Sequence, residues 1–324
     1  GYPGQNALWP NPSLAAHATN AAQRKELLRQ LRSIDAEKLD KDRYLEWMLV
    51  EKSLSDEVAG QAYPEQFILV HQRTGVQQDI ADTLSMMPKF SHQDFTDRLA
   101  RLENAESYIL STIEVLREGL ARGITPPKIT LRDVPGQIRN TIPTDIDKSP
   151  LLTSFSGFPD SIDQAEQEKI TARARQIIQQ KIYPAFESLL HFLEDDYIPN
   201  SNASIALIDM PNGAAWYRHR AKTFTTSDLT PKQIHQLGLS EVKRIRKEMD
   251  KVISASGFDG TFDEFTHFLR TDPQFYMTSA DDLMVGYRDI AKRADPELAK
   301  LFGKLPRMPY GVIPIPAYAA KSQT

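Results

Sequence analysis

Helix-start signals are the sequence feature that most limits what this chain can fold into. Residues 230–233, Thr-Pro-Lys-Gln, combine a threonine cap, a proline at the first helical position and a glutamine three residues after the cap. Such a capping box satisfies exposed backbone amides, and a proline at that position sacrifices no helical hydrogen bond. Residues 261–264, Thr-Phe-Asp-Glu, form a second capping box, and Ser279 precedes a third helical pattern. The C-terminal third is therefore predicted to contain three helices.

Apolar residues recur at helical spacing along most of the chain, whereas strand-like alternation is rare. The stripe after Thr230 consists of Ile234, Leu237, Val242, Ile245, Met249 and Val252. Similar patterns predict a helix capped by Asn20, helices near 42–58 and 75–87, two helices over 91–123, and a long helix over 162–193 kinked at Pro184. The predicted fold class is mainly α: a multi-helix array with long kinked helices and a short Pro-rich extended segment at the C-terminal end.

Prolines and small polar residues divide this helical pattern. We expect an N-terminal helical region over 1–142, an exposed connection over 143–160 and a second helical region over 161–324. The second region closes on "LPRMPYGVIPIPAY", in which four prolines fall between Pro306 and Pro316. Because proline removes a backbone donor and fixes φ, this segment is predicted to be extended and to lead into further structure.

Composition excludes several classes of protein. The chain has 39 basic and 43 acidic residues, interspersed, so the concentrated basic face that nucleic acid requires is not expected. No apolar run approaches the roughly 20 residues of a membrane span. The absence of cysteine removes disulfides, thiol catalysis and Cys-ligated zinc, but assigns no compartment. Because the first residue is glycine, we expect that the natural start has been removed.

Motifs for catalysis or metal binding are not found. The seven histidines never occur at the i, i+4 spacing that places two imidazoles on one helical face, so no HExxH motif is present. The sequence Ser240-Glu241-Val242-Lys243 matches the S-x-x-K pattern, but it lies on a charged helical face without the accompanying elements and is interpreted as coincidence. The sequence therefore predicts no catalytic residue and no metal ligand within this chain.

An aromatic and basic cluster precedes the Thr230 capping box. It comprises Tyr217, Arg218, His219, Arg220 and Lys222. In one interpretation a tyrosine hydroxyl and cationic groups orient a carboxylate or backbone carbonyl of a substrate. In the other, the segment is a connecting strand whose Tyr217 packs inward while its basic groups are solvated. The spacing alone favours the second interpretation.

Several blocks of the chain resemble a known bacterial family, the domain of unknown function 885 family. They are "LREGLARGITPPKI", "IYPAFESLLHFLEDDYIP", "NGAAWY", "FTTSDLTPKQIHQLGLSEVKRIRKEM", "FLRTDPQFYMTSADDLMVGYRDI" and "LPRMPYGVIPIPAY". Each block alone is weakly specific, but together, in the expected order, they cover most of the chain from about residue 95 onward.

This resemblance implies a largely helical zinc metallopeptidase of the HExxH type, about twice as long as this chain and often exported or lipid-anchored. The zinc motif of such proteins follows the Pro-rich block, so this chain would be the N-terminal portion, inactive alone, forming one wall of a substrate cleft. Zinc is expected only in the full-length protein. The expected partners are the missing C-terminal half and a peptide substrate, with neither nucleic acid nor a membrane span. A periplasmic or secreted location is expected, with the cytoplasm left open.

Under this resemblance the aromatic and basic cluster regains weight as a substrate-contacting segment. The candidate substrate-binding residues are Tyr217, Arg218, Arg220, Tyr276 and Tyr310. The alternative is a helical binding or scaffold protein without hydrolytic activity. If residues 210–226 and the Pro-rich segment line a cleft that the missing half completes, this chain is expected to expose an apolar surface that the missing half covers; its residues are Met308, Tyr310, Val312, Ile313, Ile315 and Tyr318.

Overall fold

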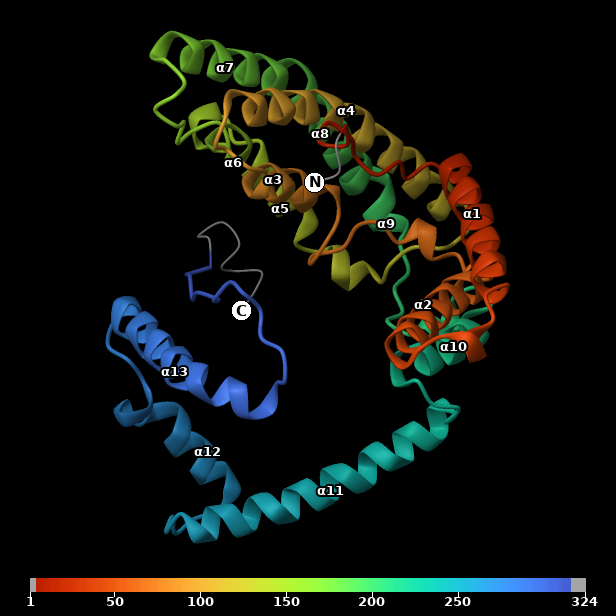
Figure 1. Cartoon of the computed structure of the whole chain (residues 1–324), viewed down its shortest axis with the longest axis vertical. Coiled ribbons are helices and arrows are strands. Elements are labelled where there is room, and N and C mark those ends of the chain that lie inside the picture. The colour runs from red at the N-terminus through yellow and green to blue at the C-terminus, as the bar shows by residue number, and fades with distance from the viewer. Residues whose placement is uncertain (1–3, 316–324) are drawn as a thin grey trace. The chain divides into compact units, whose positions relative to one another are not determined.

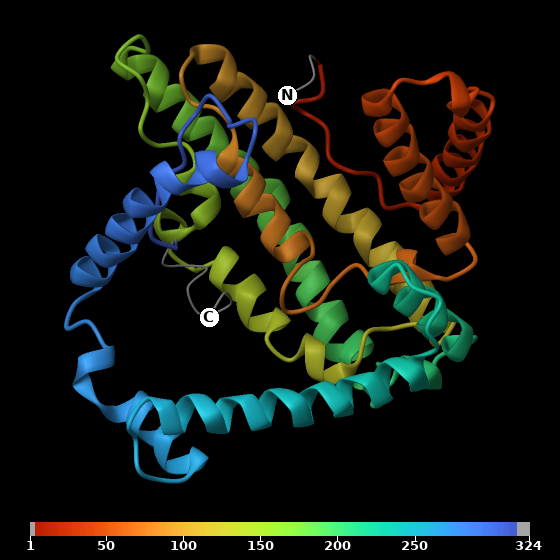
Figure 2. The same cartoon turned by 60° about the horizontal axis from the view of Figure 1, so that its bottom comes forward.

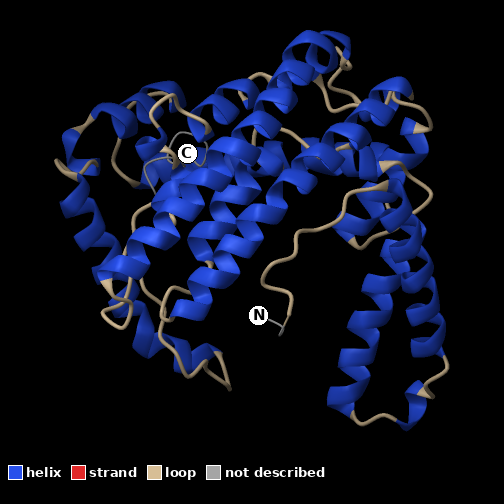
Figure 3. Cartoon of the chain, turned by 90° about the horizontal axis from the view of Figure 1, so that it is seen from above, coloured by secondary structure: helices blue, strands red, loops and turns tan. Residues whose placement is uncertain are grey.

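The structure, a computed structural model, describes residues 4–315 and is built from helices, with no β-strand among those residues (Figure 3). Helices account for 70% of the chain, which confirms the predicted mainly α class. The chain forms two compact units, Gly1–Asp228 and Leu229–Thr324, and each is described by itself. Figures 1 and 2 show their helices in two views.

The first unit contains ten α-helices within its described residues. They are α1 (Leu14–Arg32), α2 (Lys41–Gly60), α3 (Val76–Met86), α4 (His92–Ala121), α5 (Val134–Thr141), α6 (Pro150–Thr153), α7 (Gln164–Ile177), α8 (Tyr183–Phe192), α9 (Ile198–Asn200) and α10 (Gly213–Thr225). Helices α1 and α2 pack against each other as a hairpin, in which the Trp47 indole donates to the Leu31 carbonyl over 3.0 Å. A short 3₁₀ helix, η2 (Glu65–Phe67), follows that hairpin.

Helix α4 lies at the centre of the first unit's core and contacts α3, α7 and α8 (Figure 1). Its buried apolar residues follow helical spacing, and they are Phe95, Leu102, Ala105, Ile109, Ile113, Val115 and Leu116. The prediction of two helices over 91–123 is wrong, because this stripe continues without a break from the Ser91–Asp94 capping box to Ala121. The helix ends as predicted near Gly123, whose φ of +68° favours glycine.

Helices α7, α8 and α9 form one helical rod interrupted by two π-helical turns. Residues Ile178–Ile182 and Leu193–Tyr197 adopt the π form, and each turn ends just before a dipeptide that contains proline, Tyr183-Pro184 and Ile198-Pro199. A proline inside an α-helix lacks the amide for the i−4 carbonyl and its ring crowds that carbonyl. The wider turns accommodate Pro184 and Pro199, where the sequence predicted only a kink at Pro184.

Two further details differ from the sequence predictions. Asn20 does not cap the first helix, because α1 begins at Leu14 and the Ser13 hydroxyl accepts from the amide of Ala16. The interval 143–160 is not an exposed connection, since it contains α6 and contributes buried side chains to the main core. Those side chains are Ser149, Leu151, Leu152, Ser154 and Phe155.

The second unit consists of α11 (Pro231–Ala255), α12 (Phe262–Thr271) and α13 (Ala280–Leu301), followed by residues 302–315 without regular structure. Both predicted capping boxes are confirmed, because the side chain of Thr230 accepts from the amide of Gln233 and that of Thr261 from the amide of Glu264. The Ser279 cap is confirmed as well. Within 229–315 the only buried hydrophobic residue is Ile253.

Candidate functional site: the α10 surface and its groove

The aromatic and basic cluster lies on a helix, α10, rather than on a strand or an irregular segment. The helix starts at Gly213, where a Cβ would lie 1.9 Å from the carbonyl oxygen of Leu207. Only glycine fits at this close approach, so Gly213 determines where the helix can begin. The preceding residue, Asn212, adopts a left-handed conformation with φ of 56°. The connecting strand of the second interpretation is therefore wrong, and which side chains of the cluster are accessible depends on the faces of α10.

One face of α10 is held against η2 by a shared carboxylate. The Trp216 indole donates to Glu65 Oε1 over 2.9 Å, and Arg220 Nη1 donates to the same oxygen over 2.6 Å. The His219 ring stacks on Tyr63, with ring centroids 4.9 Å apart. The side chain of Trp216 is buried by these contacts. This face anchors the helix.

Glu65 keeps its negative charge because of these donors. Partial burial acts to raise its pKa, but the hydrogen bonds from Trp216 and Arg220 outweigh burial and leave the pKa below its usual value. Arg220 is further occupied by a cation–π contact, its guanidinium lying 5.1 Å from the centroid of the Phe224 ring. To bind a substrate carboxylate, Arg220 would therefore have to divide its hydrogen bonds between Glu65 and the substrate, or to leave Glu65.

The other two predicted residues of the cluster lie outside the anchored face of α10. Tyr217 and Arg218 are exposed, and the described structure gives neither of them a hydrogen bond or an ion pair. Their positions one and two residues after Trp216 turn them away from the anchored face. Tyr217 and Arg218 are consequently the side chains of this helix that could meet a partner without breaking an internal contact.

A groove of about 580 Å³ lies beside the anchored face, within the range of small-ligand sites. Three helices and the segment after α2 line it, with His17, Arg24, Glu57, Gly60, Gln61, Tyr63, Gln66, His219, Thr223 and Phe224 among the lining residues. Its charged groups are already paired, Arg24 with Glu57 and Arg220 with Glu65. The groove is thus an electrostatically balanced surface.

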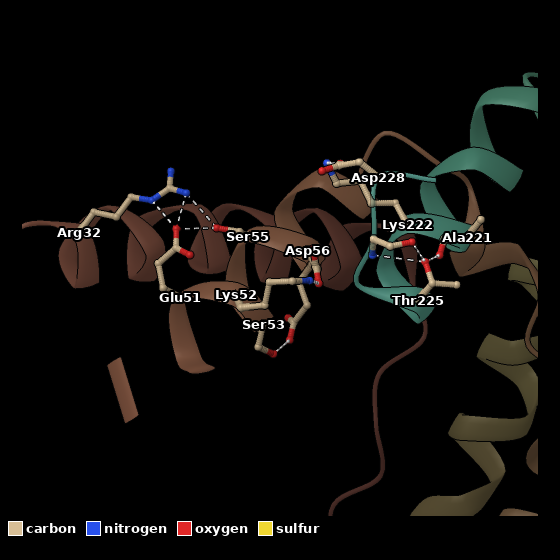
Figure 4. A network of polar contacts seen from close by, with 12 residues as sticks. Arg32, Glu51, Lys52, Ser53, Ser55, Asp56, Ala221, Lys222, Thr225 and Asp228 are labelled. Carbon is tan, nitrogen blue, oxygen red and sulfur yellow. Dashed lines mark hydrogen bonds and ion pairs between the residues drawn. The ribbon is translucent and has the colours of Figure 1, made fainter. Parts of the chain in front are cut away.

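Polar side chains near the C-terminal end of α10 make contacts with one another, and Figure 4 shows them together with part of α2. Lys222 Nζ lies 2.6 Å from Asp228 Oδ1, and the Thr225 hydroxyl donates to the Ala221 carbonyl over 2.8 Å. The hydrogen bond with Asp228 holds the pKa of Lys222 above its usual value. Thr226 stops the helix in a left-handed conformation, φ 52°, which is uncommon for a β-branched residue. Lys222 is therefore engaged locally.

The other two predicted site residues belong to the second unit. Tyr276 donates its hydroxyl to the Leu269 carbonyl over 3.3 Å, and Tyr310 donates to the Ala291 carbonyl over 3.0 Å. Both rings are largely exposed. The structure therefore brings Tyr217, Arg218 and Arg220 together on one helix, while Tyr276 and Tyr310 make hydrogen bonds within the second unit.

Sequence reasoning missed Glu65 and Trp216, the two residues that fix α10. They are 151 positions apart, and neither belongs to a recognisable motif. A buried tryptophan generally needs a partner for its N–H, but the sequence does not indicate which of many carboxylates supplies it.

The described residues do not fit a zinc ion. Among residues 4–315, no three His, Cys, Asp or Glu side chains gather closely enough to hold a metal. Within the same range, no helix is both long and apolar enough to cross a lipid bilayer.

The chain was compared with known families, curated proteins and solved structures. No curated protein matches the chain. A crystal structure described as that of "the putative lipoprotein from Colwellia psychrerythraea" shares the fold, with a TM-score of 0.83 and 19% sequence identity. The match covers 93% of this chain but 55% of that chain, so this chain spans about half the length of the solved protein. The family described as "Bacterial protein of unknown function (DUF885)" matches residues 1–324. The chain therefore belongs to the DUF885 family of bacterial proteins.

Proposed function

We propose that this chain is the helical portion of a longer zinc metallopeptidase and forms one wall of its peptide-binding cleft. The observation that carries the proposal is that some side chains of α10 anchor the helix while others remain free to contact a ligand. Trp216 and Arg220 fix the helix through Glu65, while Tyr217 and Arg218 project from it without internal partners in the described structure. A rigid helix that presents a phenol and a guanidinium can donate hydrogen bonds to peptide carbonyls or to a terminal carboxylate.

Zinc chemistry is not assigned to any residue of this chain. The described residues offer no set of metal ligands, so the metal and its general base would belong to polypeptide outside these 324 residues. The half-length match to the solved protein supports the existence of such polypeptide. What this chain supplies in the proposal is orientation of the peptide, which lowers the entropic cost of reaction.

A second candidate is a helical binding protein without hydrolytic activity. The groove beside α10 favours it, because a cavity of about 580 Å³ lined by aromatic rings and internally paired charges suits ligand binding without catalysis. For either function we propose a location outside the cytoplasm, which the name of the solved lipoprotein supports.

Two measurements test the proposed function. The longer protein encoded by the same reading frame should contain an HExxH helix, retain one zinc after exhaustive dialysis and cleave fluorogenic peptides. Residues 1–324 alone should retain no stoichiometric zinc and cleave nothing. Zinc held by residues 1–324 alone, or a longer protein without zinc or cleavage, would contradict the proposal and favour the binding protein.

Substitutions on α10 test the role of its free face. Arg218→Ala and Tyr217→Phe in the longer protein should raise KM roughly 3- to 10-fold, the size of an exposed hydrogen bond to a charged or carbonyl group, with a smaller change in kcat. Arg218→Lys should restore part of the loss. Lys148→Ala, which removes another exposed cation of the first unit, is the matched control and should leave KM unchanged.

A further inference from the structure

Helix α11 carries an apolar stripe that its own unit leaves uncovered. The stripe consists of Leu237, Val242, Ile245, Met249 and Val252, and these side chains are 43–67% exposed. They recur at spacings of three to five residues, so they lie along one side of the helix. Exposed apolar residues scattered singly need no explanation, but Val242, Ile245, Met249 and Val252 lie within one narrow arc of the helix, with Leu237 at its edge, and such a row marks an interaction surface.

The second unit has little with which to cover this stripe. Helix α12 packs near the C-terminal part of α11, where Ile253 is buried and the Arg246 guanidinium lies 3.5 Å from the centroid of the Phe262 ring. The aromatic side chains of this unit are used among themselves, as in the Phe258–Phe265 contact at 5.1 Å. Helix α13 exposes a further apolar row, Leu283, Tyr287 and Ile290, each 48–58% exposed.

Three occupants of the stripe can be compared. A second copy joined through a coiled coil is disfavoured, because the a/d spacing of Val242, Ile245, Met249 and Val252 spans only two heptads, short of the three or four that such a dimer needs. An anionic lipid surface is less favoured because the two arginines of the helix, Arg244 and Arg246, are already paired with its carboxylates Glu241, Glu248 and Asp250.

The third occupant is more of the same protein. The fold of this chain recurs over 93% of its length in a solved protein, of which it makes up 55%. In that protein, therefore, the same helices accompany nearly as much polypeptide again. An added domain of that size can supply the several hundred Å² of apolar surface that a row of this length requires.

We propose that the α11 stripe is the docking surface for polypeptide of the same protein that lies outside residues 1–324 and presents an apolar surface. This inference rests on the part of the proposed function that places the chain in a longer protein, and it is independent of zinc or peptide cleavage.

Single-cysteine labelling tests the proposal, because the chain has no native cysteine. Ile245→Cys and Met249→Cys place the thiol in the stripe, and Ser240→Cys places it on the polar side of the same helix as a matched control. The rate of maleimide labelling is measured for each variant in residues 1–324 and in the longer protein. Circular dichroism confirms that each variant remains helical.

In the longer protein, labelling at 245 and 249 should slow at least tenfold, while labelling at 240 should be unchanged. Equal rates in both proteins would overturn the proposal. Slow labelling at 245 and 249 in residues 1–324 alone would also overturn the proposal. If this protection does not depend on protein concentration, other residues within 1–324 cover the stripe. If the protection increases with protein concentration, a second copy of the chain covers it. A longer protein that protects the stripe but lacks zinc and cleavage would sink the proposed function and leave the docking surface standing.

Discussion

Helices α4 and α11 begin with the same chemistry and end in different environments. Each starts with a capping box, at Ser91–Asp94 and Thr230–Gln233, and each carries apolar residues at helical spacing. Yet α4 has ten buried residues, whereas Ile253 alone is buried on α11. The comparison teaches that caps and periodicity specify a helix and its apolar side, but they do not specify what covers that side.

The ion pairs of the two units differ in whether they join residues of one helix or residues of different segments. Every ion pair within the described part of the second unit joins residues three or four apart on one helix, such as Arg244 with Glu241. The first unit also joins segments that are distant in sequence, including Arg173 with Glu103 and Arg220 with Glu65. Local pairs support a helix, while distant pairs hold helices together. The second unit thus has strong local structure and weak tertiary structure.

Separating the two units should have the largest effect. Residues 4–228, expressed alone, should unfold cooperatively with a free energy of about 5–15 kcal/mol, as a single core of this kind supports. Residues 229–315 alone should retain helical circular dichroism but show no cooperative transition in urea, because their apolar surfaces are largely uncovered. A sharp, reversible transition of the isolated second unit would break the comparison.

Shortening a buried apolar side chain of the first unit and an exposed one of the α11 stripe should give different losses of stability in the same chain. Leu189→Ala on α8 removes a fully buried side chain and should cost about 2–5 kcal/mol in urea unfolding. Val242→Ala on α11 removes an exposed one and should change stability by about 0.5 kcal/mol or less in the same chain. In the longer protein the cost of Val242→Ala should rise if the stripe is covered. Equal costs for the two variants in residues 1–324 would contradict the contrast.

Lowering the pH should have the smallest effect on the stability of the first unit through Glu65. The lowered pKa of Glu65 means that its bonds to Trp216 and Arg220 contribute their full stability above its unfolded pKa of about 4.3. The contribution is lost as pH falls through the lower folded pKa. Because the carboxylate is about half exposed, solvent screening keeps the contribution below about 1 kcal/mol.

Glu65→Gln tests this contribution directly. It should lower the urea midpoint of the first unit at pH 7 and leave it nearly unchanged at pH 2.5. Glu241→Gln, which breaks a local pair on α11, is the control and should not shift the first unit at either pH. A difference for Glu65→Gln that grows on acidification would show that the sign of the linkage is wrong.

The sequence predicted the helical class and the caps at Thr230, Thr261 and Ser279, because those signals act within one turn of chain. It misjudged features that depend on distant residues. Helix α10 was missed because its start depends on Gly213 passing close to Leu207, and its anchoring depends on a carboxylate 151 residues before Trp216. Of the candidate site, Tyr217 and Arg218 are placed where a partner can reach them, and their role stays a proposal.

The two π turns of the α7–α9 rod have a consequence for how this chain tolerates insertions and deletions. Buried residues Ala174, Ile178, Ile182, Phe186 and Leu190 recur every fourth position, a spacing that drifts about 40° per step around an ordinary α-helix. The π turn Ile178–Ile182 lies inside this row and holds more residues per turn, which reduces the drift, and α4 contacts the rod on both sides of that turn. Removing one residue, such as Gln179, would replace the five π residues by four α residues, which rotate through nearly the same total angle, so the two halves of the rod would keep their relative orientation. A one-residue change in chain length is therefore absorbed at such a turn, whereas the same change in the α-helical parts would rotate one half of the rod about 100° against the other, so relatives that differ by one residue should place the gap within these turns.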